Sequence, residues 1–220
     1  PSGRILVIDL CRRALTLSCR DWDGVAIAAF DRAIQLMPSL YQVWYARGIA
    51  LSYNEEQEAI ESFDRAIQGK EDFGPAWRWR GIVLSSVKQY EDALASLEKA
   101  ISLDRKDSAA HFWRIVALKK LNRYKDGLDA CNEAIESPLD SRIKYLFYNL
   151  CALTRIILGD AEGALADANK AIELNHNFAE AYFVRGVVHH RQGDYPAALS
   201  NLNQAISLNE KDGSFDRWFN

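Results

Sequence analysis

"FDRAIQ" occupies Phe30–Gln35 and occurs again, unchanged, at Phe63–Gln68. Related hexapeptides follow, namely LEKAIS from Leu97, CNEAIE from Cys131, ANKAIE from Ala168 and LNQAIS from Leu202. The alanines that these segments share are separated by 33, 34, 34, 37 and 34 residues. A period of this length indicates a repeat protein in which each copy forms one structural unit.

A second, aromatic series precedes the hexapeptides and keeps the same period: WYARG from Trp44, WRWRG from Trp77, HFWRI from His111, YNLCA from Tyr148 and YFVRG from Tyr182. In isolation, the alternation in WRWRG is typical of a strand or of a nucleic-acid contact. The other copies do not alternate, so we drop the strand interpretation, and the nucleic-acid interpretation loses most of its support. At 100° per residue, an aromatic residue and a small residue four positions later share one face of a helix, and Trp77 and Gly81 show this pairing.

The pattern resembles the tetratricopeptide repeat, a helix–turn–helix unit of about 34 residues. The third copy carries the family's residue types throughout, at Trp77, Gly81, Leu84, Tyr90, Ala93, Leu97 and Ala100. The resemblance implies an all-α fold, a right-handed superhelical α-solenoid of stacked helix–turn–helix pairs. One pair cannot bury its own apolar face, so the pairs have to stack.

We expect a single solenoid domain over residues 1–220. Its repeats are predicted at 5–38 (degenerate), 39–72, 73–107, 108–141, 145–178 and 179–212, with 213–220 beginning a capping or further helix. The second repeat lacks one residue in its turn, and three extra residues lie around Ser137–Lys144.

Composition limits the function classes. The net charge of −3 gives no reason to expect nucleic acid, and no stretch approaches the length of a membrane span. The cysteines Cys11, Cys19, Cys131 and Cys151 have neither metal-site nor CxxC spacing, so we expect them buried and reduced in a cytoplasmic protein.

The resemblance also implies that the first helix of each pair lines a concave groove. The residues predicted to face it are Tyr45, Ile49, Tyr53, Arg78, Trp79, Phe112, Trp113, Lys119, Lys120, Asn149, Phe183, His190 and Arg191. Most are apolar or aromatic, with cations towards the ends of the helices. This composition favours a protein or peptide partner that is apolar, with acidic residues where it meets Lys119, Lys120 and Arg191. Burial between adjacent first helices is an equal alternative for Trp79 and Trp113.

Arg47, Arg80, Arg114 and Arg185 all stand seven residues into their repeats. A binding ladder is one interpretation. We favour a structural salt bridge or stacking role, because this position flanks the core face of the helix.

No catalytic motif, metal site or cofactor site is recognisable, and we predict a non-enzymatic binding scaffold without cofactor or metal. The alternative is a structural spacer or self-association arm of a larger protein, for example through a homodimer. A third class, an enzyme that uses His190 and Arg191, has no supporting motif.

Overall fold

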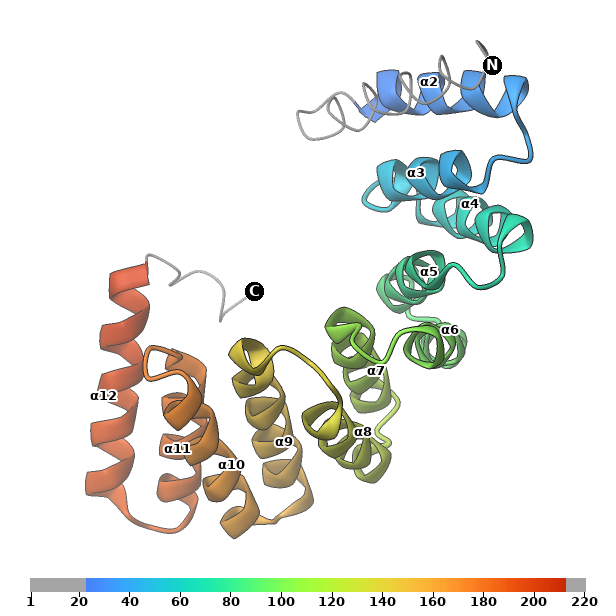
Figure 1. The fold of residues 1–220 in the computed structure, drawn as a ribbon. Coiled ribbons are helices and arrows are strands. Elements are labelled where there is room, and N and C mark those ends of the chain that lie inside the picture. The colour runs from blue at the N-terminus through green and yellow to red at the C-terminus, as the bar shows by residue number, and fades with distance from the viewer. Residues whose placement is uncertain (1–22, 213–220) are drawn as a thin grey trace. The chain divides into compact units, whose positions relative to one another are not determined.

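The computed structural model describes residues 23–212 (Figure 1). The first half of the first repeat, Cys11, Cys19 and the segment 213–220 lie outside the described residues. Within residues 23–212 every regular element is a helix. The chain divides into two compact units, Pro1–Ala117 and Leu118–Asn220.

The N-terminal unit alternates second and first helices of successive repeats. In chain order these are α2 (Asp23–Leu36), α3 (Tyr41–Leu51), α4 (Glu56–Gly69), α5 (Gly74–Ser86), α6 (Tyr90–Leu103) and α7 (Ser108–Lys120), with the division between the units inside α7. The even-numbered helices are second helices, which carry the FDRAIQ-type segments. The helices α3, α5 and α7 are first helices.

The C-terminal unit continues the pattern with α8 (Tyr124–Glu136), a 3₁₀ turn η1 (Ser141–Ile143), α9 (Lys144–Leu158), α10 (Ala161–Leu174), α11 (Ala179–Arg191) and α12 (Tyr195–Asp212). The η1 turn lies among the extra residues predicted around Ser137–Lys144. The predicted all-α solenoid of helix–turn–helix pairs is therefore confirmed.

Glycines hold the two helices of a pair close together, as the aromatic series predicts. A Cβ atom on Gly81 would lie 2.6 Å from Leu97 Cγ, and one on Gly48 would lie 2.6 Å from Phe63 Cε1. Real Cβ atoms do not approach so closely, so a larger residue would force the helices apart. The absence of a side chain on the glycine of the first helix thus leaves the space that the large residue of the second helix fills.

The aromatic residue of this series also bonds to the backbone. Trp44 Nε1 donates to the carbonyl of Pro38 at 2.9 Å, and Trp77 Nε1 donates to the carbonyl of Glu71 at 2.8 Å. In both cases the acceptor lies six residues earlier, in the loop between repeats. His111 occupies the same place in the next repeat and is fully buried. These rings therefore anchor the loop as well as filling the core.

Four of the turns within the described pairs share one conformation. Gly159, Gly193, Lys88 and Asn122 each lie two residues before a second helix, with φ values of 82°, 81°, 64° and 57°. Glycine adopts this left-handed region without strain, whereas Lys88 does so at a cost. The residue that the second repeat lacks is missing from α3, which has 11 residues against 13 in α5, and not from the turn as predicted. The α3–α4 turn spans residues 52–55 and has no positive φ.

Candidate partner-binding surface

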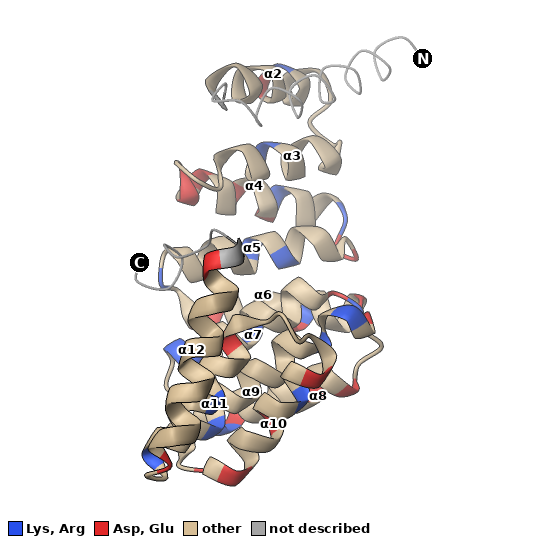
Figure 2. Ribbon diagram, turned by 90° about the vertical axis from the view of Figure 1, so that its left-hand side faces the viewer, with Lys and Arg blue, Asp and Glu red and all other residues tan. Residues whose placement is uncertain are grey.

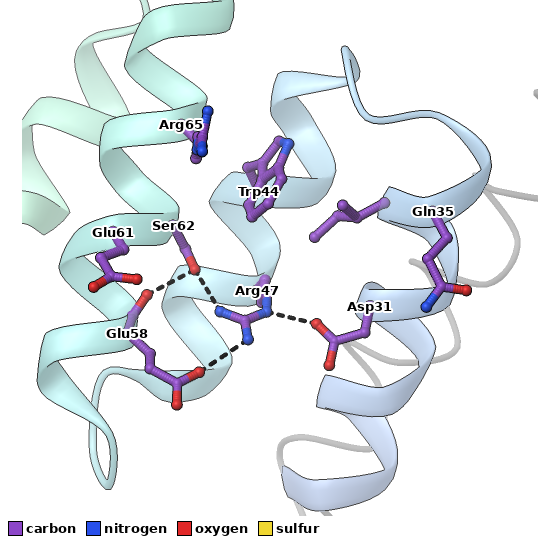
Figure 3. A pocket seen from close by; sticks show the side chains of 9 residues that line it. Asp31, Gln35, Trp44, Arg47, Glu58, Glu61, Ser62 and Arg65 are labelled. Atoms are coloured by element: carbon purple, nitrogen blue, oxygen red, sulfur yellow. Dashed lines mark hydrogen bonds and ion pairs between the residues drawn. The ribbon is translucent and has the colours of Figure 1, made fainter.

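The repeated arginine joins neighbouring repeats. In the second repeat, Arg47 Nε lies 2.7 Å from Asp31 Oδ1 on α2, and Arg47 Nη2 lies 3.0 Å from Glu58 Oε2 on α4 (Figure 3). Arg47 Nη1 also donates to Ser62 Oγ at 2.8 Å. One guanidinium thus links its own second helix to the second helix of the preceding repeat.

Other repeats contain the same arrangement. Arg80 bonds Asp64 and Ser96, and Arg185 bonds Asn169 and Asn201, all at 2.6–2.8 Å. The structural interpretation of these arginines is confirmed for Arg47, Arg80 and Arg185, and Arg114 is buried.

The fifth repeat departs from this pattern. Cys151 stands where the other repeats have arginine, and Arg155, one turn later on α9, bonds Asp167 at 2.8 Å and Asp160 at 2.6 Å. Cys151 and Cys131 are buried and free, and their thiols share a hydrogen bond. This bond and the burial raise the pKa of Cys151. The expectation of buried, reduced cysteines is confirmed for these two residues.

A cavity of about 450 Å³ lies beside the Arg47 network (Figure 3). It is lined by Asp31, Ile34, Gln35, Trp44, Arg47, Glu58, Glu61, Ser62 and Arg65. Arg47 is already paired with both Asp31 and Glu58. We therefore interpret this cavity as a consequence of the arginine bridge, and the surface of the first helices remains the candidate site.

In the N-terminal unit, aromatic side chains gather on that surface. The Tyr45 ring meets the Phe73 ring edge-on at 5.0 Å, and Phe73 meets Tyr41 in the same way. Ile49 and Trp79 are half-buried and pack against the core. Trp79 was predicted either to face the groove or to be buried between first helices. The side chain combines both features, because it packs on the core and keeps part of its surface exposed.

Arg78 is bonded to side chains of the same unit, namely Asp107 and Tyr45. Its Nη1 lies 2.9 Å from Asp107 Oδ2, and the Asp107 side chain is only 7% exposed. Asp107 Oδ1 also accepts a bond from the backbone of Ala110 in the first turn of α7. Burial raises the pKa of Tyr45. The Arg78 guanidinium, which bonds the Tyr45 hydroxyl, lowers this pKa, but the effect of burial is larger. The Arg78 charge is therefore already neutralised, which leaves the centre of this surface aromatic and uncharged.

Phe112 and Trp113 extend the surface onto α7. Their rings meet at 5.8 Å and 87°, and Trp113 packs against the core cluster that contains Leu97. Both side chains keep part of their area exposed. Tyr53, in the turn that follows α3, is 77% exposed.

The remaining predicted residues belong to the C-terminal unit. Lys119 and Lys120 are exposed in the last turn of α7, and Phe183 is exposed on α11. His190 is exposed and its ring meets Tyr195 at 5.7 Å. Arg191 Nη1 donates to the carbonyl of Ile156 at 3.0 Å, so this cation joins α11 to α9.

Asn149 differs from the prediction. It is 6% exposed, and its Oδ1 has no hydrogen-bond partner among the described residues. The same position carries a longer side chain in other repeats, for instance Phe112 and Phe183, which retain exposed area. The Asn149 side chain is shorter than these rings and is buried, so almost none of its surface is open to a partner.

Sequence reasoning missed the apolar surface of α12. Tyr195, Leu199 and Ile206 are 64%, 62% and 49% exposed. The sequence did indicate this surface. Leu199 and Ile206 occupy repeat positions that also carry apolar residues in the earlier second helices.

Family comparisons agree with the repeat spacing. Models described as "Tetratricopeptide repeat" match residues 80–141 and 179–212, and one described as "TPR repeat" matches residues 154–193. The chain belongs to the tetratricopeptide repeat family. This tetratricopeptide repeat protein has no described helix that is long and apolar enough to cross a membrane, and residues 23–212 contain no cluster of potential metal ligands.

Several known proteins are similar to it. Protein SGT1 homolog from Bos taurus is 33% identical over 72 residues, which are 33% of this chain and 21% of that protein. The chain thus spans about a fifth of that relative. Among solved structures, MamA matches with a TM-score of 0.68 at 18% identity, covering 82% of this chain and 97% of MamA. YrrB matches with a TM-score of 0.65 at 21% identity, covering 83% and 93%. These structures support the fold.

Proposed function

We propose that this tetratricopeptide repeat protein is a non-catalytic scaffold that binds a peptide or protein segment on the first helices of its N-terminal unit. The observation that carries the proposal is the partly exposed aromatic surface formed by Tyr45, Trp79 and Phe112. A helix face that meets only water is normally polar, whereas apolar area left partly open is typical of interaction sites. We call this set the aromatic surface.

The fixed Arg78 defines the chemistry of the ligand. Because Asp107 and Tyr45 already bond its guanidinium, Arg78 has little attraction left for an acidic partner. The part of the ligand that meets the aromatic surface is therefore apolar. Acidic residues are expected only where a ligand reaches Lys119 and Lys120, which are exposed.

Protein interaction fits what is known of relatives with this fold. YrrB is described as a TPR protein with an unusual peptide-binding site, and Cut9 forms a hetero-tetramer with Hcn1. The alternative for this chain is a spacer or self-association arm.

Peptide selection tests the proposal. A random peptide library is displayed to the full chain, and the selected peptides are titrated against the wild type and against Tyr45→Ala. We expect apolar, aromatic-rich peptides whose affinity falls about tenfold or more with Tyr45→Ala, as for an interface anchor. Glu98→Ala on the exposed part of α6 is the matched control and should bind as the wild type does. Selection of no apolar peptide, together with concentration-dependent self-association, would favour the alternative.

A further inference from the structure

A second cavity, of about 410 Å³, lies beside the α2–α3 loop of the N-terminal unit. It is lined by Pro38, Ser39, Trp44, Arg65, Gln68 and Gly69. Trp44 and Arg65 also line the cavity beside the Arg47 network, so the two cavities adjoin. Among the described residues that line the second cavity, Arg65 is the only one that carries a charge. We call this second cavity the Arg65 cavity.

The guanidinium of Arg65 has no ion-pair partner within residues 23–212. Figure 2 shows both charge signs along α4, and Glu61 lies one turn before Arg65 on that helix, yet no ion pair joins these two described residues. In Figure 3, Arg65 projects from α4 on the side of Trp44, whereas Arg47 is bonded to partners on two helices. Because Arg65 is also exposed, its charge is available to a ligand.

The next repeat junction contains an equivalent loop. Trp44 donates its indole N–H to the carbonyl of Pro38 in the α2–α3 loop. Trp77 donates in the same way to the carbonyl of Glu71, in the loop between α4 and α5. Pro38 and Glu71 therefore occupy equivalent places in the two loops, and of these two residues only Glu71 has a carboxylate.

The cations of the two junctions are equivalent as well. Arg65 and Lys99 occupy the third place in the repeated hexapeptides FDRAIQ and LEKAIS. Lys99 Nζ lies 3.7 Å from Glu71 Oε1, so the loop of its own junction supplies a carboxylate. Because Pro38 has none, the earlier junction has the cation of such a pair without its anion. The missing chemistry is that of a carboxylate beside Arg65.

Ser39 and Gln68 add hydrogen-bond donors to the Arg65 cavity. Both are exposed, and no described residue bonds either side chain. A carboxylate has about four acceptor sites, and an arginine guanidinium fills two of them when it binds in a bidentate manner. A hydroxyl and an amide N–H are suited to the others. Trp44 is partly exposed and presents indole surface to apolar atoms, so the lining fits a carboxylate with an apolar group next to it.

We propose that the Arg65 cavity binds an acidic side chain of a partner protein. The Arg65 guanidinium holds the carboxylate, Ser39 and Gln68 donate to it, and the Trp44 indole contacts the apolar residue beside it. A protein segment fits better than a free metabolite, because the lining residues other than Trp44 are exposed and would leave a small molecule largely in water. Glu61 lines the adjoining cavity, so the partner has no second acidic residue on that side. This site is separate from the aromatic surface and does not depend on the proposed function.

An NMR titration of the full chain, read at the indole N–H signal of Trp44, tests the site. The probe is a blocked pentapeptide whose central glutamate is flanked by prolines and alanines, and the matched peptide has glutamine in its place. We expect a saturable shift with the glutamate peptide and about tenfold weaker binding of the glutamine peptide. Benzoate, a free carboxylate with a planar ring, should bind more weakly than the glutamate peptide. Equal or tighter binding of benzoate would overturn the assignment to a protein partner.

Substitutions in the protein separate this site from a general effect of charge. Arg65→Gln should weaken binding of the glutamate peptide about tenfold or more, whereas Arg105→Gln, at an exposed arginine outside the cavity, should not. Pro38→Glu supplies the carboxylate that Glu71 supplies in the next junction and should block the peptide, while Pro38→Gln should still bind it. Wild-type affinity in Arg65→Gln or in Pro38→Glu, or no saturable shift in the wild type, would overturn the proposal. Phe112→Ala should leave this binding unchanged, and a loss there would instead assign the peptide to the aromatic surface.

Discussion

At the scale of single residues, close packing explains why glycine follows the aromatic residue of several repeats. In Gly81→Ala the new Cβ would lie 2.6 Å from Leu97 Cγ and 3.1 Å from the carbonyl of Ala93. We expect a loss of about 1–3 kcal/mol in the free energy of unfolding, because the two helices cannot both keep their places. Urea denaturation measures it.

Gly24→Ala is the matched control for this substitution. Gly24 lies in α2, and a Cβ atom there would have nothing within 4 Å, so the same change should be neutral or stabilise by about 0.4–1 kcal/mol. Equal effects of the two substitutions would contradict the packing argument.

The buried thiols give a second residue-scale prediction. Their mutual hydrogen bond and burial raise the pKa of Cys151, so the reactive thiolate is scarce at neutral pH. Iodoacetamide should leave Cys131 and Cys151 unmodified in the native protein and modify both in denaturant, as read by peptide mass mapping. Rapid native labelling of either residue would show that α8 and α9 do not enclose them.

At the scale of elements, the turns before α6, α8, α10 and α12 each require one residue with a positive φ. Lys88 meets this requirement at φ 64°, in the left-handed region that costs a side chain about 1–2 kcal/mol. Lys88→Gly should therefore stabilise the protein by roughly 0.5–1 kcal/mol after the entropic cost of glycine is subtracted. Thermal denaturation measures it. Gly159→Ala, at φ 82°, should shift the melting temperature in the opposite direction, and parallel shifts would contradict the assignment.

The start of α10 carries a pH-dependent contribution. Asp160 accepts hydrogen bonds from the backbone of Gly163 and from Arg155, and these lower the pKa of its carboxyl group. A lowered folded-state pKa means that the stabilisation is present at neutral pH and is lost as the pH falls through the folded pKa. Asp160→Asn keeps an acceptor for the cap but removes the charge. Its melting temperature should lie below that of the wild type at pH 7, and the gap should close as the pH falls below the ordinary aspartate pKa of about 3.9. A gap that is the same at both pH values would contradict this.

At the scale of the whole molecule, repeat spacing predicted the helix pairs because one periodic constraint acts on every copy. It placed Gly81 against the second helix and favoured a structural role for Arg47, both of which the structure confirms. It could not foresee the Arg78–Asp107 pair, whose members are 29 residues apart and depend on side-chain conformations. Nor could it foresee that Asn149 is buried, because the exposed fraction of a short side chain depends on the size and conformation of the side chains around it.

The partner surface could be predicted from the sequence only in outline. Spacing indicates which side of a first helix is opposite the core, and the structure shows how much of each side chain remains exposed there. The aromatic surface retains exposed apolar area, while the prediction that a partner occupies it awaits a binding measurement.

That measurement is the affinity of a selected apolar peptide for Phe112→Ala, compared with the wild type and with Glu98→Ala. Phe112 is half-buried beside Trp113, so part of its ring is open to a ligand. We predict a loss of about 1–3 kcal/mol in binding free energy for Phe112→Ala, wild-type affinity for Glu98→Ala, and an unchanged circular dichroism spectrum for both. Wild-type affinity for Phe112→Ala and Tyr45→Ala alike would contradict the account, because the ligand would then bind away from the aromatic surface.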